Sequence, residues 1–242
     1  MSARSRSRGI NGGRSAQRAS RTVYEDVRER IVTMALPPST TIDRLELCSR
    51  HGVSQSPVRE ALQDLEREGL VVAYPQSRTL VTRIDVNRLR NEQFLRIAVE
   101  CEIVRTLAEG DGGETLAGAS ALLAEQDALI GNVARIDKFR RLDDAFHRTL
   151  FEGAGQLELY EHIRSRSGHM ARLRTLDLPS EGKMRAVVDD HRRIVNAITD
   201  GDAIAAADAM RLHLSGTIDR LMVLSTQHPD LFDDRRHPLP AA

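Results

Sequence analysis

The sequence contains no tryptophan and few aromatic residues of any kind, which limits the folds that it can form. Phe and Tyr together make up 3% of its 242 residues, whereas strand-rich cores depend heavily on aromatic and β-branched side chains. Because the hydrophobic content is 40%, the core must be built from Leu, Ile, Val and Ala. This composition predicts a mainly helical protein, and the length fits one large domain or two of ordinary size.

Cysteines and long apolar stretches are also scarce. Cys48 and Cys101 are the two cysteines, and their spacing matches neither a disulfide framework nor a zinc motif. The longest stretch without a charged side chain covers residues 31–42, which is too short to cross a bilayer. We therefore expect a cytoplasmic protein that is not integral to a membrane.

The net charge is zero, which excludes a bulk polycation, but the balance changes along the chain. Residues 1–84 hold 14 arginines and nine acids, whereas residues 85–242 hold 21 basic and 26 acidic side chains. The sequence thus predicts a basic front part and an acidic back part. Residues 1–21 carry six arginines, no acid and almost no apolar residue, so we expect a disordered basic arm.

The front part has the pattern of a helix-turn-helix. A first helix is predicted from Thr22 to the prolines at 37–38. Asp43 and Glu46 have the spacing of a capping box and predict the start of a short second helix. Its end is predicted at Gly52, and Ser54 is placed to cap a third helix shortly afterwards. Two short helices joined by a tight glycine-containing turn form a helix-turn-helix.

A predicted β-hairpin follows, with strands at 70–74 and 79–82, and would form a wing. The third helix presents polar side chains at its N-terminal end, which is the end that a recognition helix inserts into the major groove. Arg59 either contacts a base or phosphate of DNA, or it is a solvated or salt-bridged residue, since Glu60 and Glu66 lie on the same helix. In this setting we favour DNA contact. The candidate DNA-contacting residues are Arg44, Ser54, Gln55, Ser56, Arg59 and Arg78.

The stretch Gly52-Val-Ser-Gln-Ser-Pro-Val-Arg-Glu-Ala-Leu62, followed by residues 65–71, closely resembles the winged helix-turn-helix of the GntR family of bacterial regulators. Three positions depart from the family pattern: Gln55 replaces an Arg, Pro38-Ser39 occupy a turn that often contains Gly, and Arg78 replaces a wing Gly. The resemblance implies a homodimeric transcription factor, more often a repressor, that binds double-stranded DNA. The departures predict an unusual operator preference and an extra cation on the wing.

The back part shows only helical periods. Helices are predicted at 85–109, 114–131, 135–153, 156–177, 181–200 and 202–225, which together would form a bundle. The predicted organisation is therefore an arm at 1–21, a winged helix-turn-helix at 22–84, a helical metal- and effector-binding domain at 85–226 and a flexible tail at 227–242.

Four polar side chains fall within the apolar stripes of these helices. Asp143 and His147 lie one turn apart, and His191 and His213 occupy the stripes of the last two helices. A single inward-facing His is more often a satisfied core residue than a ligand, but four such groups would each cost about 1–3 kcal/mol if unpaired. A divalent metal explains all four, because imidazole and carboxylate suit Zn, and also Ni, Fe or Mn. The metal would either be structural or leave a position open for a ligand.

The motif Asp143-x-x-Phe146-His147-x-x-Leu150 resembles the first metal motif of the FCD effector domain in FadR-type GntR regulators, and His191 and His213 fall where its other ligands do. Arg96 matches a family Arg that lines the effector cavity, although an interhelical salt bridge explains this residue equally well. The resemblance implies a small organic-acid or sugar-acid effector.

The alternative that the metal residues leave open is a metal-dependent hydrolase or lyase with an accessory winged-helix module. Such an enzyme needs a base or nucleophile beside the metal, and we identify no catalytic motif and no catalytic residue. We therefore favour a regulator over an enzyme. His162 and His169 lie on one face of the predicted helix at 156–177. His169 or Arg172 could border the effector cavity, but we favour an exposed polar face.

Overall fold

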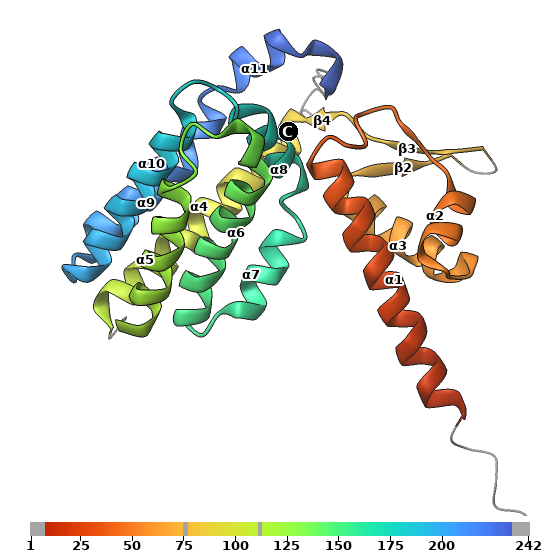
Figure 1. The fold of residues 1–242 in the computed structure, drawn as a ribbon, viewed down its shortest axis with the longest axis horizontal. Helices are drawn as coiled ribbons and strands as arrows, with labels where there is room; N and C mark the ends of the chain where they lie inside the picture. Colours follow the sequence, from red (N-terminus) through yellow and green to blue (C-terminus); the bar gives the residue numbers. More distant parts are fainter. Residues whose placement is uncertain (1–7, 75–76, 111–112, 234–242) are drawn as a thin grey trace, which may run out of the picture. The chain divides into compact units, whose positions relative to one another are not determined.

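The computed structural model describes residues 8–74, 77–110 and 113–233, leaving out the side chains of residues 8–14. The chain divides into two compact units, Met1–Arg83 and Ile84–Ala242. Figure 1 shows a helical unit with a small sheet and a separate bundle of helices. The predicted fold class, a winged helix-turn-helix plus an all-α bundle, is confirmed. None of the described helices is long and apolar enough to span a membrane.

The first unit combines helices with a three-stranded antiparallel sheet in the order β1-β3-β2. Its elements are α1 (Arg8–Val32), β1 (Thr41–Ile42), α2 (Arg44–His51), α3 (Gln55–Glu68), β2 (Val71–Ala73) and β3 (Thr79–Val81). Val72 of β2 lies opposite Leu80 of β3, so these strands form the predicted hairpin. Buried aliphatic residues such as Val27, Leu47 and Leu65 join the helices into one core.

The helix ends of the helix-turn-helix follow the predicted positions, although the capping bonds differ. The carboxylate of Asp43 accepts the first two free backbone N–H groups of α2, at 2.8 and 3.2 Å. Glu46 does not complete a capping box there, because it pairs with Arg50. Gly52 ends α2 with a φ of 62°, a conformation that Gly adopts without strain. Ser54 occupies the N-cap position of α3, but its side chain makes no capping hydrogen bond.

Helix α1 includes residues 8–21, which differs from the disordered arm predicted there. The helix is fixed by packing further along, where Val27 is fully buried. Each residue added to a formed helix gains a hydrogen bond without the cost of a new nucleus. An i,i+4 pair of Arg21 with Glu25, at 2.9 Å, adds support. Residues 1–7 of the predicted arm lie outside the described residues.

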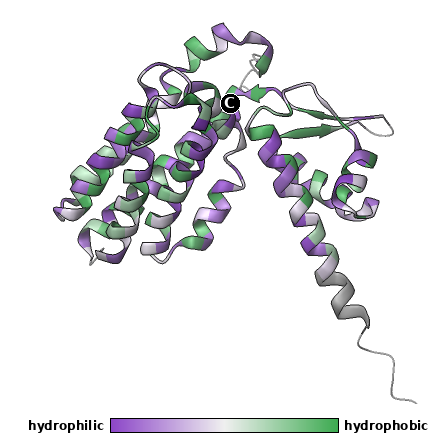
Figure 2. Cartoon of the chain, in the orientation of Figure 1, coloured by the Kyte–Doolittle hydropathy of each residue, from purple (hydrophilic) through white to green (hydrophobic). Residues whose placement is uncertain are grey.

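The second unit is a bundle in which α4 packs along α10 and α9, and α5 packs against α6 and α9. Its helices are α4 (Val86–Glu109), α5 (Gly113–Asp127), α6 (Ile136–Gly153), α7 (Leu157–Arg164), α8 (Gly168–Asp177), α9 (Lys183–Thr199), α10 (Ala203–Ile218) and α11 (Leu221–Gln227), with a 3-10 turn η1 at Val133–Arg135. Figure 2 shows hydrophobic and hydrophilic stripes along these helices. The predicted helix at 156–177 is two helices, α7 and α8, and the one at 202–225 is α10 and α11.

Part of the predicted flexible tail is structured. A 3-10 turn η2 (Pro229–Leu231) leads into β5 (Phe232–Asp233), which pairs in parallel with β4 (Ile84–Asp85). Phe232 is buried and anchors this pairing. A strand of two residues has no periodicity from which it can be predicted. Residues 234–242 lie outside the described part.

Candidate metal centre and nucleic-acid interface

Asp143 and His147 lie one turn apart on α6, on the side that faces the interior of the bundle. Their exposed fractions are 1% and 3%, and the neighbouring Phe139 and Phe146 are fully buried. The helical period places all four on one face. Both polar side chains therefore point inward, as the sequence predicts.

His191 of α9 and His213 of α10 meet this pair. The ring of His191 stacks on Phe146 with centroids 3.9 Å apart. His147 Nε2 lies 3.2 Å from His213 Nε2, and His191 Nε2 lies 3.6 Å from an oxygen of Asp143. One potential ligand atom from each of the four residues lies within 4.8 Å of the others. The structure thus brings together the four residues that the sequence singles out.

A second layer of side chains faces the outer nitrogens of the rings. His147 Nδ1 lies 2.6 Å from Glu100 Oε2, and His191 Nδ1 lies 2.8 Å from Gln126 Oε1. The Gln126 oxygen is an acceptor, so His191 Nδ1 carries the proton and its Nε2 presents a lone pair to the centre. The Glu100 carboxylate lies in the corresponding place beside His147. Asp190 is placed similarly toward His213, but at 3.6 Å.

The electrostatics favour the neutral, metal-binding form of two of the histidines, His191 and His213. Burial, together with His213, His147 and Arg174, holds the pKa of His191 well below its usual value of 6.5. Burial and nearby cationic groups also hold the pKa of His213 well below that value. Burial opposes ionisation of Glu100, but Arg96 and His147 outweigh it and lower its pKa. Neutral imidazole and ionised carboxylate are the forms that a metal requires.

These residues fit a divalent cation. His191 Nε2 is buried and has no hydrogen-bond partner within the described part of the chain, and unpartnered polar atoms are rare in protein interiors. The Nε2 atoms of His147 and His213 lie 3.2 Å apart, so they either share a proton in a hydrogen bond or hold a cation between them. Three imidazoles and one carboxylate are a donor set typical of zinc and related ions.

Arg174 of α8 is a further member of the site that the sequence did not identify. Its guanidinium pairs with Asp143, so Asp143 faces both the imidazoles and a cation. Burial and the charges of Arg96 and Arg140 lower the pKa of Arg174 to about 9, which still leaves it charged at neutral pH.

A pocket of about 390 Å³, counting the space at its open mouth, adjoins the centre. It is lined by His213 and by the cations Arg96, Arg174 and Lys183, with mainly apolar residues around them. No described acidic residue belongs to this lining. Arg96 also pairs with Glu100 at 2.6 Å. This salt bridge lies within α4 and is not the interhelical one expected as the alternative to pocket lining. The arrangement suits a small anionic ligand.

The N-terminal end of α3 in the first unit is polar and exposed. Ser54, Gln55, Ser56 and Arg59 are all exposed, whereas Val58 on the other side is buried. Because the Ser54 hydroxyl does not cap the helix, it is available to a phosphate, as are the free N–H groups of the first turn. This end of α3 has the chemistry of a recognition helix.

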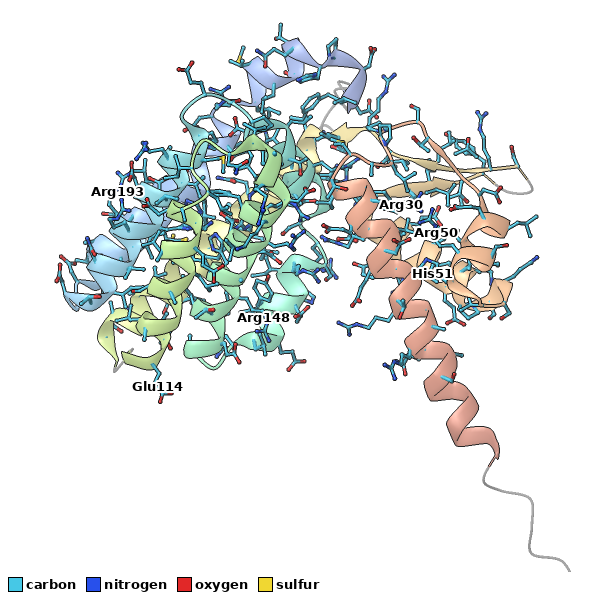
Figure 3. The ribbon with its side chains drawn as sticks, in the orientation of Figure 1. Arg30, Arg50, His51, Glu114, Arg148 and Arg193 are labelled. Carbon is cyan, nitrogen blue, oxygen red and sulfur yellow. The ribbon has the colours of Figure 1, made fainter. Side chains whose placement is uncertain are left out.

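Arg59 has no ion-pair or hydrogen-bond partner among the described residues. Of the alternatives to DNA contact, the salt bridge with a Glu of its own helix is not found, whereas a solvated side chain agrees with the exposure of Arg59. Glu66 accepts the backbone N–H of Ala73, and Glu60 lies 3.4 Å from the Ser56 hydroxyl. By contrast, His51 of α2, labelled in Figure 3, is held by Asp26 at 3.2 Å.

The other two predicted DNA contacts lie on or beside the sheet, and both are exposed. Arg44, at the start of α2, donates to the Thr79 hydroxyl of β3 at 3.0 Å. The guanidinium of Arg78 lies 5.8 Å from the ring centroid of Tyr74, across the base of the wing. The turn residues 75–76 lie outside the described part.

Comparisons with known proteins identify both units. A family model of bacterial regulatory proteins of the gntR family matches residues 19–81, and the FCD domain model matches residues 94–216. An HTH-type transcriptional regulator in an unstable DNA locus of Streptomyces ambofaciens is 34% identical over 224 residues, which cover 88% of this chain and 89% of that protein. The chain belongs to the GntR family. It is a GntR transcriptional regulator with an FCD domain.

Other relatives of this GntR regulator support the assignment. The HTH-type transcriptional repressor RspR of Escherichia coli is 26% identical over 222 residues, covering 90% of this chain and 95% of RspR. Among solved structures, E. coli McbR/YncC has a TM-score of 0.68 at 19% identity and covers 87% of this chain and 98% of its own. A GntR regulator of Rhodococcus sp. RHA1 has a TM-score of 0.65 at 20% identity, with 84% and 97% covered. These two structures show the shared fold.

Several residues of this GntR regulator that surround the metal centre escaped prediction from the sequence. Glu100, Gln126 and Arg174 come from three different helices and reach the site only through tertiary packing. His169 is buried, with 1% exposed, and not on an exposed face as expected. Its Nδ1 accepts the backbone N–H of Asp85 at 3.0 Å. No periodic signal marks such residues, because polar side chains are also typical of exposed helix faces.

Proposed function

We propose that this GntR regulator is a repressor that responds to a small carboxylate bound beside a divalent metal. The observation that carries the proposal is His213, which belongs both to the four-residue cluster and to the pocket lining. A ligand in the pocket would therefore lie next to the metal. The adjoining Arg96 and Arg174 favour an acid.

The chain would hold the metal through Asp143, His147, His191 and His213, and Zn suits this donor set best. When bound, the metal supplies positive charge and an open position for carboxylate oxygens. Glu100 and Gln126 orient the rings of His147 and His191 from behind. Arg96 and Arg174 would pair with the carboxylate of the acid and orient it.

The coupling to DNA would run through α8. Arg174 of this helix pairs with the metal ligand Asp143. His169, less than two turns earlier on α8, accepts the N–H of Asp85 in β4, where the second unit begins. A ligand that moves α8 would therefore act on residues 83–87, where the first unit ends and the second begins, and which would serve as a hinge. The ligand shifts the equilibrium between the DNA-binding and the non-binding arrangement only if it binds the two arrangements with different affinity.

The DNA-binding state would be a homodimer on a near-palindromic operator, because a single winged helix reads only one half-site. Three large apolar side chains of the second unit, Phe94, Ile204 and Met222, are exposed by 76%, 76% and 81%. Such exposure supports a surface that a second copy covers. The repressor assignment is supported by the name of the relative RspR.

An operator selected from a random DNA library with the purified protein would make the response measurable. We expect fluorescence anisotropy to show that an acid which stabilises the protein in a thermal-shift screen weakens operator binding at least ~tenfold, about 1.4 kcal/mol of coupling. A chelator should abolish the response. If no stabilising acid changed the operator affinity, the proposal would be overturned. The alternative would then be a protein that binds DNA without responding to an effector and whose metal has a structural role.

A further inference from the structure

Lys183, at the start of α9, is a cation of the pocket that the proposed function does not use. It is one of two lysines in a chain with 35 basic residues, and it lines the pocket together with Arg96 and Arg174. Its side chain is 12% exposed. A largely buried ammonium requires compensation by an opposite charge.

The compensation that Lys183 receives inside the protein is incomplete. Its ammonium lies 2.9 Å from one oxygen of Asp177, a fully buried carboxylate. The other oxygen of Asp177 lies 2.6 Å from Arg220 Nε. Two cations thus share one carboxylate, which leaves one positive charge in excess beside the pocket. Arg220 is 40% exposed and reaches water, whereas Lys183 faces the pocket.

The other cations of the pocket differ in this respect. Arg96 has its own carboxylate in Glu100, and Arg174 has its own in Asp143. Asp190, which lies near Lys183, is already paired with Arg193 on the outer side of the bundle, labelled in Figure 3. The pairing of the described residues therefore leaves the excess charge at Lys183. A divalent metal held by the His213 cluster would add further positive charge.

We propose that the ligand is a dicarboxylic acid whose second carboxylate binds Lys183. One carboxylate would lie at the metal, Arg96 and Arg174. The other would neutralise the excess positive charge of the group formed by Lys183, Arg220 and Asp177. A monocarboxylate fills only the first position and leaves the second charge uncompensated. This inference rests on the proposed carboxylate function and specifies its ligand class.

The test compares acids that differ in one charge only. Isothermal titration of the zinc-loaded full chain would use succinate against succinamate and glutarate against glutaramate. We expect the dicarboxylate of at least one pair to bind about tenfold more tightly, the value of a charged hydrogen bond. In Lys183→Met this preference should fall below about threefold while the affinity for the monoacid and the zinc content stay unchanged. Lys138→Met, which removes an exposed lysine paired with Glu125, should keep the preference.

Each result has a distinct meaning. Equal binding of diacid and monoamide by the wild type would overturn the dicarboxylate inference and leave the carboxylate function standing. Binding of neither acid, with zinc present, would overturn both. An undiminished preference in Lys183→Met would remove the role of Lys183. If this variant fails to fold by circular dichroism, Lys183→Gln replaces it, and the wild-type comparison alone still decides the ligand class.

Discussion

At the scale of single residues, His191 has the most constrained environment in the metal centre. Its Nδ1 faces the oxygen of Gln126, its ring stacks on Phe146, and its Nε2 has no partner in the described part of the chain. Because Gln126 and Phe146 fix the orientation of the ring and Nε2 has no hydrogen-bond partner, this nitrogen is arranged to bind a ligand that is not part of the polypeptide. The pH response of the metal-free protein should reveal this arrangement.

The free energy of unfolding of the metal-free protein should fall as the pH drops below about 6.5. The pKa of His191 and of His213 is held well below 6.5 in the folded state, so the unfolded chain binds protons in this range that the folded chain does not. Urea midpoints at about pH 7.5 and about pH 5.5 measure the loss. His191→Gln should show a smaller decrease, and an equal decrease in this variant would contradict the assignment.

Arg59→Ala should weaken specific operator binding by about 1–3 kcal/mol and leave the metal content intact. The guanidinium is exposed and has no partner among the described residues, so its removal disturbs no internal contact. Arg67→Ala is a suitable control, because Arg67 is exposed near the other end of α3 and pairs with Asp64. Equal operator affinity of the Arg59 variant and the wild type would contradict a docking geometry in which the N-terminal end of α3 contacts DNA.

At this scale the sequence predicts residues whose position depends on helical period alone. Asp143, His147 and His191 could be placed because each falls within an apolar stripe. Glu100 and Arg174 could not, because their role depends on which helices become neighbours. The position of Ser39 illustrates a departure with a physical cost, since it has a φ of 69° in the turn where the family often has Gly.

At the scale of elements, the packing of α5 against α6 is exceptionally close at Gly153. A Cβ there would lie 2.1 Å from Oγ1 and 2.8 Å from Cβ of Thr115. Gly153→Ala should therefore lower the free energy of unfolding by about 1–3 kcal/mol through overpacking. Gly118→Ala, in the same pair of helices, meets its nearest atom at 3.4 Å and should be near neutral. Chemical unfolding of both variants measures the contrast, and two equal midpoints would be the contrary result.

The elements that sequence patterns miss are those without a period. The split of the predicted helix 156–177 occurs at a turn around 165–167 with no Pro, although Gly168 opens α8. The pairing of β4 with β5 joins two-residue strands far apart in the chain. By contrast, α4, α6 and α9 begin and end within two residues of their predicted bounds, because each has a long apolar stripe or a clear flanking turn.

At the scale of the whole molecule, the zero net charge divides into a basic DNA-binding unit and an acidic FCD unit, for which we propose a metal and an acid ligand. Residues 1–21, with six arginines, add to the basic unit. Deleting residues 1–14 keeps the buried Ser20 of α1 and removes four of these arginines. The salt dependence of DNA binding should become less steep, by about 0.9 in logarithmic slope for each DNA phosphate that the shortened protein no longer neutralises. An unaltered slope would show that these arginines do not touch DNA.

The central claim is that Asp143, His147, His191 and His213 bind a divalent metal in this GntR regulator. Metal analysis of the purified protein by plasma mass spectrometry, after exhaustive dialysis, tests it most directly. The account predicts a stoichiometric divalent ion in the wild type and in Arg59→Ala, and its loss in a folded His191→Ala/His213→Ala double variant. Undiminished metal content in the double variant would contradict the account.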